Sequence, residues 1–71
     1  MRAIRERAGL RQVDVAAAMH VTQSAVSLWE LGARAPREKK AQELARLLGC
    51  SAADIGAAVE NERRRRATEK K

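Results

Sequence analysis

The segment from Gln12 to Leu31 constrains the fold more than any other part of this 71-residue chain. Its pattern is that of two short helices joined by a tight turn and packed near a right angle. Where two such helices cross, the fifth residue of the segment must be small, and it is Ala16. The ninth position favours glycine because φ is positive in the turn, and His20 tolerates that conformation better than most residues do. One shared core also needs apolar residues at the fourth, eighth, tenth, fifteenth and eighteenth positions, which hold Val15, Met19, Val21, Val26 and Trp29.

Glycine residues divide the chain into helix-forming runs. Gly9, Gly32 and Gly49 each follow such a run, as a left-handed residue after a helix end does. Good helix formers dominate the composition, and β-branched residues are scattered. We therefore predict one small all-α domain with five helices, near residues 1–8, 12–19, 23–31, 37–48 and from just after Ser51.

The end of the last predicted helix is less constrained than its start. Ser51 is a good N-cap, with Asp54 placed to favour the helix dipole, and Ile55 and Val59 face the core. Nothing after residue 57 breaks a helix, but no apolar face continues past Val59. We predict a domain over residues 1–60 and a basic C-terminal arm over residues 61–71, either a helix extension or disordered.

The charge of the chain favours polyanionic partners. The formal net charge is +6, and half of it lies in residues 60–71, which include Lys70 and Lys71. Nucleic acid is the first candidate partner and an anionic membrane surface the second.

One cysteine and one histidine make neither an internal disulfide nor a zinc site, which fits a reducing cytoplasm, and we expect no cofactor or metal. No apolar run approaches the ~20 residues that cross a bilayer, and no signal peptide opens the chain, so we expect no membrane partner.

The motif and its flanks resemble the Cro/C1-type (XRE) helix-turn-helix family over residues 2–59. The resemblance includes Ile4 and Arg5, the stretch from Gly9 to Gln12, the stretch from Val26 to Gly32, Pro36, and the stretch from Leu44 to Ser51. It implies a five-helix, lambda-repressor-like DNA-binding domain whose second and third helices form the helix-turn-helix. Three positions depart from the family pattern: His20 replaces a turn glycine, Arg11 replaces a capping Ser, Thr or Asn, and Leu28 replaces a long polar side chain.

The resemblance implies that the third helix lies in the major groove of double-stranded DNA. That groove admits one helix and presents a distinct pattern for each base pair. We expect base contacts from four outward-facing residues near the start of that helix: Gln23, Ser24, Ser27 and Leu28. Gln23 can bond adenine through both amide groups, and Leu28 can press on a thymine methyl group. The alternative is that these are ordinary surface residues of a helix.

The same resemblance places Gln12 against a backbone phosphate, at the positive end of the second helix. We expect further phosphate contacts from Arg11, Thr22, Arg34 and Arg37, whereas Lys39, Lys40 and Arg46 can equally be solubilising charges. The resemblance also implies a structural salt bridge between Arg5 and Glu30; the alternative is two independent surface charges.

These expectations describe a sequence-specific regulator, most simply a repressor of the phage or plasmid kind that binds a palindromic operator as a homodimer. One such helix contacts only a few base pairs, so two copies are usually joined. We place the dimer surface around Cys50, Ala53, Ile55, Gly56, Ala57 and Val59.

An antitoxin or adaptor that uses the fold to hold a protein partner is the alternative, and a membrane-associating basic peptide is a weaker one. An enzyme is weakest, because His20 and Cys50 lie at separate helix junctions and no catalytic constellation accompanies them. We expect a cytoplasmic, nucleoid-associated protein with no small-molecule ligand.

Overall fold

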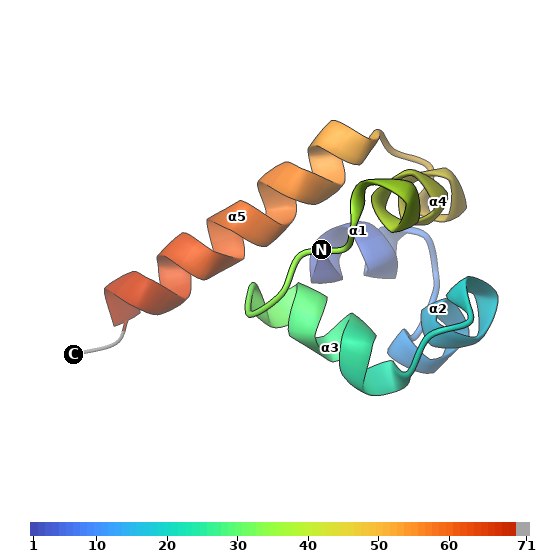
Figure 1. Cartoon of the computed structure of the whole chain (residues 1–71), viewed down its shortest axis with the longest axis horizontal. Helices are drawn as coiled ribbons and strands as arrows, with labels where there is room; N and C mark the ends of the chain where they lie inside the picture. The colour runs from blue at the N-terminus through green and yellow to red at the C-terminus, as the bar shows by residue number, and fades with distance from the viewer. Residues whose placement is uncertain (70–71) are drawn as a thin grey trace.

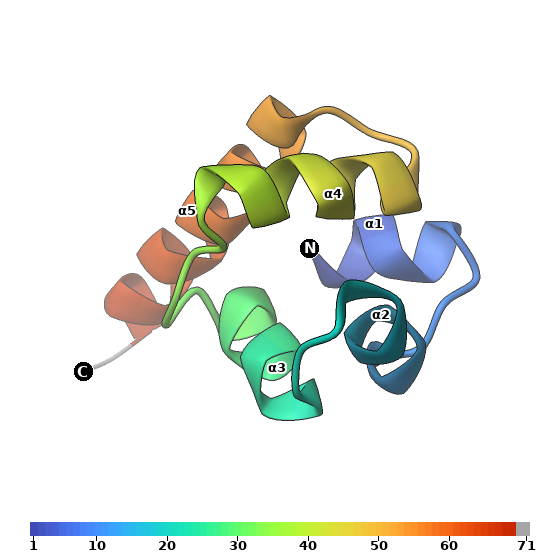
Figure 2. The ribbon, with the colours of Figure 1, turned by 45° about the vertical axis from the view of Figure 1, so that its right-hand side comes forward.

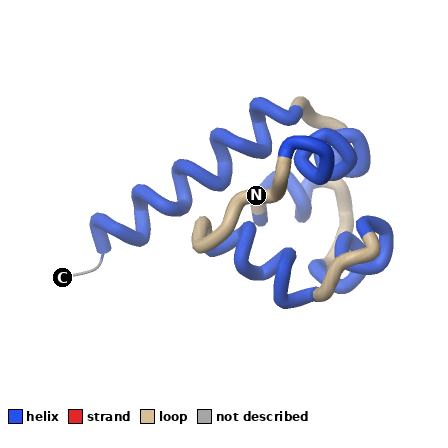
Figure 3. The backbone as a smooth tube through the Cα atoms, in the orientation of Figure 1, coloured by secondary structure: helices blue, strands red, loops and turns tan. Residues whose placement is uncertain are grey.

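A computed structural model describes residues 1–69, and these residues form five helices and no strand (Figures 1 and 3). Their bounds are α1 Arg2–Arg7, α2 Gln12–Met19, α3 Gln23–Leu31, α4 Glu38–Leu48 and α5 Ala52–Glu69. The predicted all-α class is confirmed. The predicted ranges of α2 and α3 coincide with the observed ones, α1 is one residue shorter at each end, and α4 begins one residue later. No helix in residues 1–69 is long and apolar enough to span a bilayer.

The core lies at the centre of a ring formed by α2, α3, α4 and α5 (Figure 2). Each of these helices contributes one fully buried aliphatic side chain to it: Val15, Val26, Leu44 and Ile55. Burying a side chain of this size contributes roughly 1.5–3 kcal/mol to folding. Ala16 is also buried where α2 meets α3, as expected for a residue that must be small to let the helices approach.

The turn between α2 and α3 has the expected left-handed conformation. His20 has φ 58° and ψ 43°, and it is the only non-glycine residue with positive φ among residues 1–69. The backbone N–H of Val21 donates to the carbonyl oxygen of Ala16 at 3.0 Å, which closes a Schellman motif. Lys40 from α4 donates to the carbonyl oxygen of Met19 at 3.0 Å. These two contacts satisfy the carbonyl groups of Ala16 and Met19 at the end of α2.

Caps fix both ends of α3. The Thr22 hydroxyl accepts a hydrogen bond from the backbone N–H of Ala25 at 3.1 Å, as its N-cap position predicts. At the other end Gly32 has φ 74°, and the N–H of Ala33 donates to the carbonyl oxygen of Leu28 at 3.0 Å. The bounds of α3 therefore follow from local sequence.

α5 continues well beyond the last apolar residue of its core face. It begins with a capping box, in which Ser51 and Asp54 each accept a hydrogen bond from the other's backbone N–H. Its second half passes the C-terminal end of α3 (Figure 1). Residues 61–69 of the predicted basic arm are helical, and Lys70 and Lys71 lie outside the described residues.

A close backbone contact holds the second half of α5 against α3. A Cβ atom added at Gly32 would lie 2.6 Å from the backbone nitrogen of Arg63 and 2.9 Å from its Cα atom. The Arg63 side chain returns to the same residue, where its Nε donates to the Gly32 carbonyl oxygen at 3.1 Å. The absence of an apolar face after Val59 did not indicate that α5 continues along α3, because the contact at Gly32 needs no apolar side chain.

The buried face of α5 changes the surface that is available for dimer formation. Ile55 and Val59 are 0% and 2% exposed, within the core of a single chain. Their assignment to a dimer surface was therefore wrong, because α5 uses them to pack against its own domain. The residues of that set that remain exposed on α5 are Ala53, Gly56 and Ala57.

The Gly32 contact predicts a specific loss of stability. Gly32 and Gly49 both have φ 74°, but a Cβ atom at Gly49 would meet nothing within 4 Å. We expect Gly49→Ala to lower the free energy of unfolding by about 1–2 kcal/mol through backbone strain alone. We expect Gly32→Ala to lower it by a further ~1–3 kcal/mol through overlap with α5. Urea denaturation measures both variants, and equal losses would mean that α5 does not pack closely on Gly32.

Candidate nucleic-acid interface

The outward face of α3 carries the four predicted base-contacting residues. Gln23 and Ser24 are exposed in its first turn, and Ser27 and Leu28 are half-buried one turn later. The helical repeat of 3.6 residues places these four side chains on one broad face. The structure thus brings them together on one surface.

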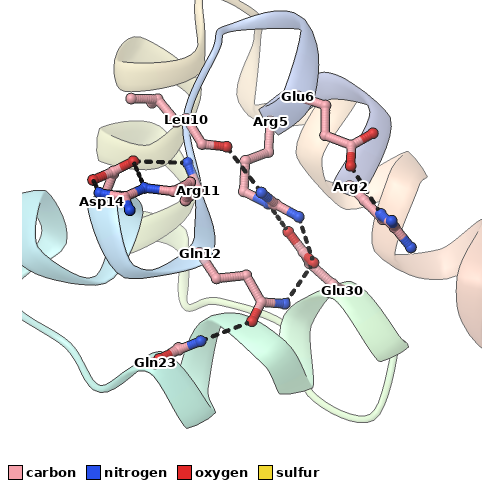
Figure 4. A network of polar contacts seen from close by, with 9 residues as sticks. All are labelled: Arg2, Arg5, Glu6, Leu10, Arg11, Gln12, Asp14, Gln23 and Glu30. Atoms are coloured by element: carbon pink, nitrogen blue, oxygen red, sulfur yellow. Dashed lines mark hydrogen bonds and ion pairs between the residues drawn. The ribbon is translucent and has the colours of Figure 1, made fainter.

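A chain of polar contacts connects this face to the interior of the domain (Figure 4). Arg5 of α1 and Glu30 of α3 form an ion pair, with side chains only 10% and 7% exposed. Arg5 also donates to the carbonyl oxygen of Leu10 at 2.8 Å. Gln12 donates to Glu30 at 2.8 Å, and Gln23 donates to the Oε1 atom of Gln12 at 3.3 Å. The contacts therefore join α1, α2 and α3.

The direction of this chain follows from the chemistry of its members. An ionised carboxylate only accepts hydrogen bonds, so Gln12 must present its amide nitrogen to Glu30. Its amide oxygen then faces Gln23, which must donate in turn. Gln23 uses one amide hydrogen on Gln12 and keeps its second hydrogen and its oxygen for another partner. This donor and acceptor pair is what a glutamine uses on adenine.

Gln12 therefore has a role that its position in the sequence did not reveal. We predicted it as a phosphate contact at the start of α2, whereas its side chain contacts both Glu30 and Gln23. A phosphate contact there remains a prediction, as does one from the backbone N–H groups of the first turn. The two glutamines are eleven residues apart in the sequence, and they meet only because α2 and α3 cross. No spacing in the sequence therefore predicts their contact.

Arg11, the N-cap residue of α2, is paired with Asp14 in the free protein. Arg11 Nε lies 3.0 Å from the Asp14 carboxylate, which also accepts from the Arg11 backbone N–H at 2.9 Å. Arginine has no acceptor, so only this half of a capping box forms. The hydrogen bonds from Arg11 lower the pKa of Asp14, and Asp14 raises the pKa of Arg11. The Arg11 side chain is nonetheless 79% exposed, with donors that face solvent.

A second set of predicted phosphate contacts lies on another side of α3. Thr22, Arg34 and Arg37 line one groove between α3 and the loop that leads to α4, and the predicted base contact Leu28 also borders it. Arg34 and Arg37 are exposed at its rim, and Trp29 and Pro36 contribute apolar surface. Thr22 is engaged as the N-cap of α3 through its hydroxyl oxygen. The outward face of α3 is thus flanked by Gln12 on α2 and by Arg34 and Arg37 in the loop.

The remaining candidate groups are His20, which follows α2, and Cys50, which lies between α4 and α5. No group of three or more histidine, cysteine or acidic side chains that could hold a metal occurs in the described part of the chain. Burial raises the pKa of the Cys50 thiol, and the charge of Asp54 raises it further. Elevation of this pKa keeps the thiol in its less reactive protonated form at neutral pH.

The buried ion pair predicts an asymmetry between two glutamates. Glu30→Ala leaves the Arg5 guanidinium buried without its counterion, and we expect a loss of about 3–5 kcal/mol in the free energy of unfolding. Glu6→Ala is the matched control, because its partner Arg2 is 75% exposed and such pairs contribute little. Urea denaturation compares the two variants. A Glu30→Ala protein as stable as the Glu6→Ala protein would show that the pair is not shielded from water.

Comparison with known proteins agrees with this geometry. A family model described as helix-turn-helix matches residues 1–55, most of the chain. No curated protein and no solved structure matches the chain in the other two comparisons. The match supports a DNA-binding regulator in general. The chain belongs to the Cro/C1-type helix-turn-helix family.

Proposed function

We propose that the chain is a sequence-specific transcriptional regulator that places α3 in the major groove of double-stranded DNA. The observation that carries this proposal is the position and orientation of the Gln23 side chain. It stands exposed in the first turn of α3, and its amide is oriented by contacts that run through Gln12 to a buried ion pair. Such preorganisation lowers the entropic cost of a bidentate contact with a base.

The neighbouring side chains of α3 extend the proposed base contacts. Ser24 and Ser27 can donate or accept, so each can adapt to more than one base edge. Leu28 offers an apolar contact of the kind that fits the thymine methyl group. We propose that Gln23 and Leu28 supply most of the sequence preference.

The cationic groups beside α3 fit the two strands that border a major groove. On one side we propose contacts from Arg11 and Gln12 at the start of α2, where the helix dipole also favours a phosphate. On the other side we propose Arg34 and Arg37, with Thr22 at the start of α3 between them and the bases. Phosphate contacts fix the register of the protein on the duplex but carry no sequence information directly.

We further propose that two copies bind a palindromic operator and act as a repressor at the nucleoid. A single α3 spans only a few base pairs, so a pair of half-sites about one helical turn apart (~34 Å) would supply the missing specificity. The exposed small residues Ala53, Gly56 and Ala57 would let α5 helices from two chains approach closely.

The test begins with selection of bound duplexes from a random pool, followed by measurement of one variant on the selected site. We expect Gln23→Ala to weaken binding to that site by about 5–150-fold, the equivalent of one bidentate base contact of ~1–3 kcal/mol. Binding to random duplex should change little, because it depends on phosphate contacts. Gln42→Ala removes the same side chain from an exposed position on α4 and should leave both affinities unchanged. Equal losses on both duplexes for Gln23→Ala would contradict a base-contacting role.

A further inference from the structure

We infer that Arg2, Arg65 and Arg66 form an additional contact site for the DNA backbone, beside the face of α3 that carries Ser27. We call these three residues the α1–α5 arginine site. The inference rests on the proposed function, because the backbone in question belongs to the duplex that α3 contacts. It assigns a binding role to residues that the helix-turn-helix motif does not include.

The docking of α5 on α3 sets the direction of each arginine in the run from Arg63 to Arg66. Successive residues of a helix point about 100° apart, so four adjacent arginines face different ways. Arg63 is used structurally, because its Nε bonds the Gly32 carbonyl oxygen. With this residue fixed on α3, the side chains of Arg65 and Arg66 line a groove that α1 also borders.

One groove brings these arginines together with the predicted DNA-contacting residues. It lies between α1, the last turns of α3 and the second half of α5, and it is lined by Arg2, Gln12, Ser27, Glu30, Arg65 and Arg66, among others. Ser27 is a proposed base contact and Gln12 a proposed phosphate contact. A DNA strand that passes Gln12 would therefore meet the α1–α5 arginine site next along this groove.

The acidic residues of the groove are already neutralised by arginines. Glu6 pairs with Arg2 at 3.0 Å, Glu62 pairs with Arg65 at 2.9 Å, and Glu30 pairs with the buried Arg5. The side chains of Arg2 and Arg65 are still 75% and 67% exposed. A guanidinium carries five N–H donors, so each can bind a phosphate oxygen without releasing its carboxylate.

Arg66 has the most freedom to bind an anion. It is exposed, and no ion pair joins it to another side chain within residues 1–67.

Arg34 and Arg37 line the groove on another side of α3. The two grooves together would provide cations for both strands that border the major groove, as a helix seated between them requires.

The test compares two double variants that remove the same net charge from the full chain. Arg65→Gln with Arg66→Gln removes two members of the site. Arg46→Gln with Arg64→Gln removes two exposed arginines that do not line this groove. Affinity for the selected duplex is measured across a salt series, and thermal unfolding verifies that both proteins are folded.

We expect the first double variant to reduce the slope of log affinity against log salt by about 0.9 for each phosphate that it no longer neutralises. Its affinity should fall about tenfold at low salt, while its preference for the selected site over random duplex stays unchanged, since phosphate contacts carry no sequence information. The control double variant should keep the slope of the original chain.

A second pair of variants applies the same test to α1. Arg2→Gln should reduce the salt slope by about 0.9, whereas Arg7→Gln, exposed at the other end of α1 and outside this groove, should not. Equal slopes for each test variant and its control would overturn the α1–α5 arginine site. The proposed function would still stand if Gln23→Ala weakened binding to the selected site more than binding to random duplex. No binding of the unaltered chain to any duplex would instead overturn the proposed function, and this inference with it.

Discussion

The buried ion pair between Arg5 and Glu30 is the interaction on which the candidate site depends. Such a pair adds little net stability, because removing two charges from water costs nearly as much as their attraction returns. Its value here is geometric. Both oxygens of Glu30 are occupied, by Arg5 from α1 and by Gln12 from α2, so α3 has one favourable position relative to both helices. The orientation of the Gln23 amide follows from that arrangement without any contact of its own to the core.

Two close approaches place the helices where the ion pair can form. Ala16 lets α2 and α3 cross, and Gly32 lets α5 lie against the end of α3. Ala16 has a small side chain and Gly32 has none, so at either position an added carbon atom displaces a helix instead of filling a cavity. The position of α3 is thus determined at one end by the turn at His20 and at the other by the backbone of α5.

The sequence predicted the parts of the fold that local chemistry determines. The end of α2 follows from His20, and the two ends of α3 follow from Thr22 and Gly32, so these bounds agree with the prediction. The end of α5 could not be predicted, because a backbone contact at Gly32 leaves no apolar period in the sequence. In the candidate site, the ion pair was implied by family resemblance and is present. The role of Gln12 was not predicted, because it arises only when the packed helices bring its side chain between the Glu30 carboxylate and the Gln23 amide.

The most direct test of the central claim is a titration of the labelled protein with a selected duplex at low salt, followed by NMR of backbone and side-chain amides. The account predicts that the side-chain amide signals of Gln23 and Gln12 move together with the backbone signals at the start of α3. The signals of α4 beyond its first turn should stay in place. Side-chain amides of Gln12 and Gln23 that remain unshifted at saturating duplex would contradict the claim that this ordered pair presents the base-contacting surface.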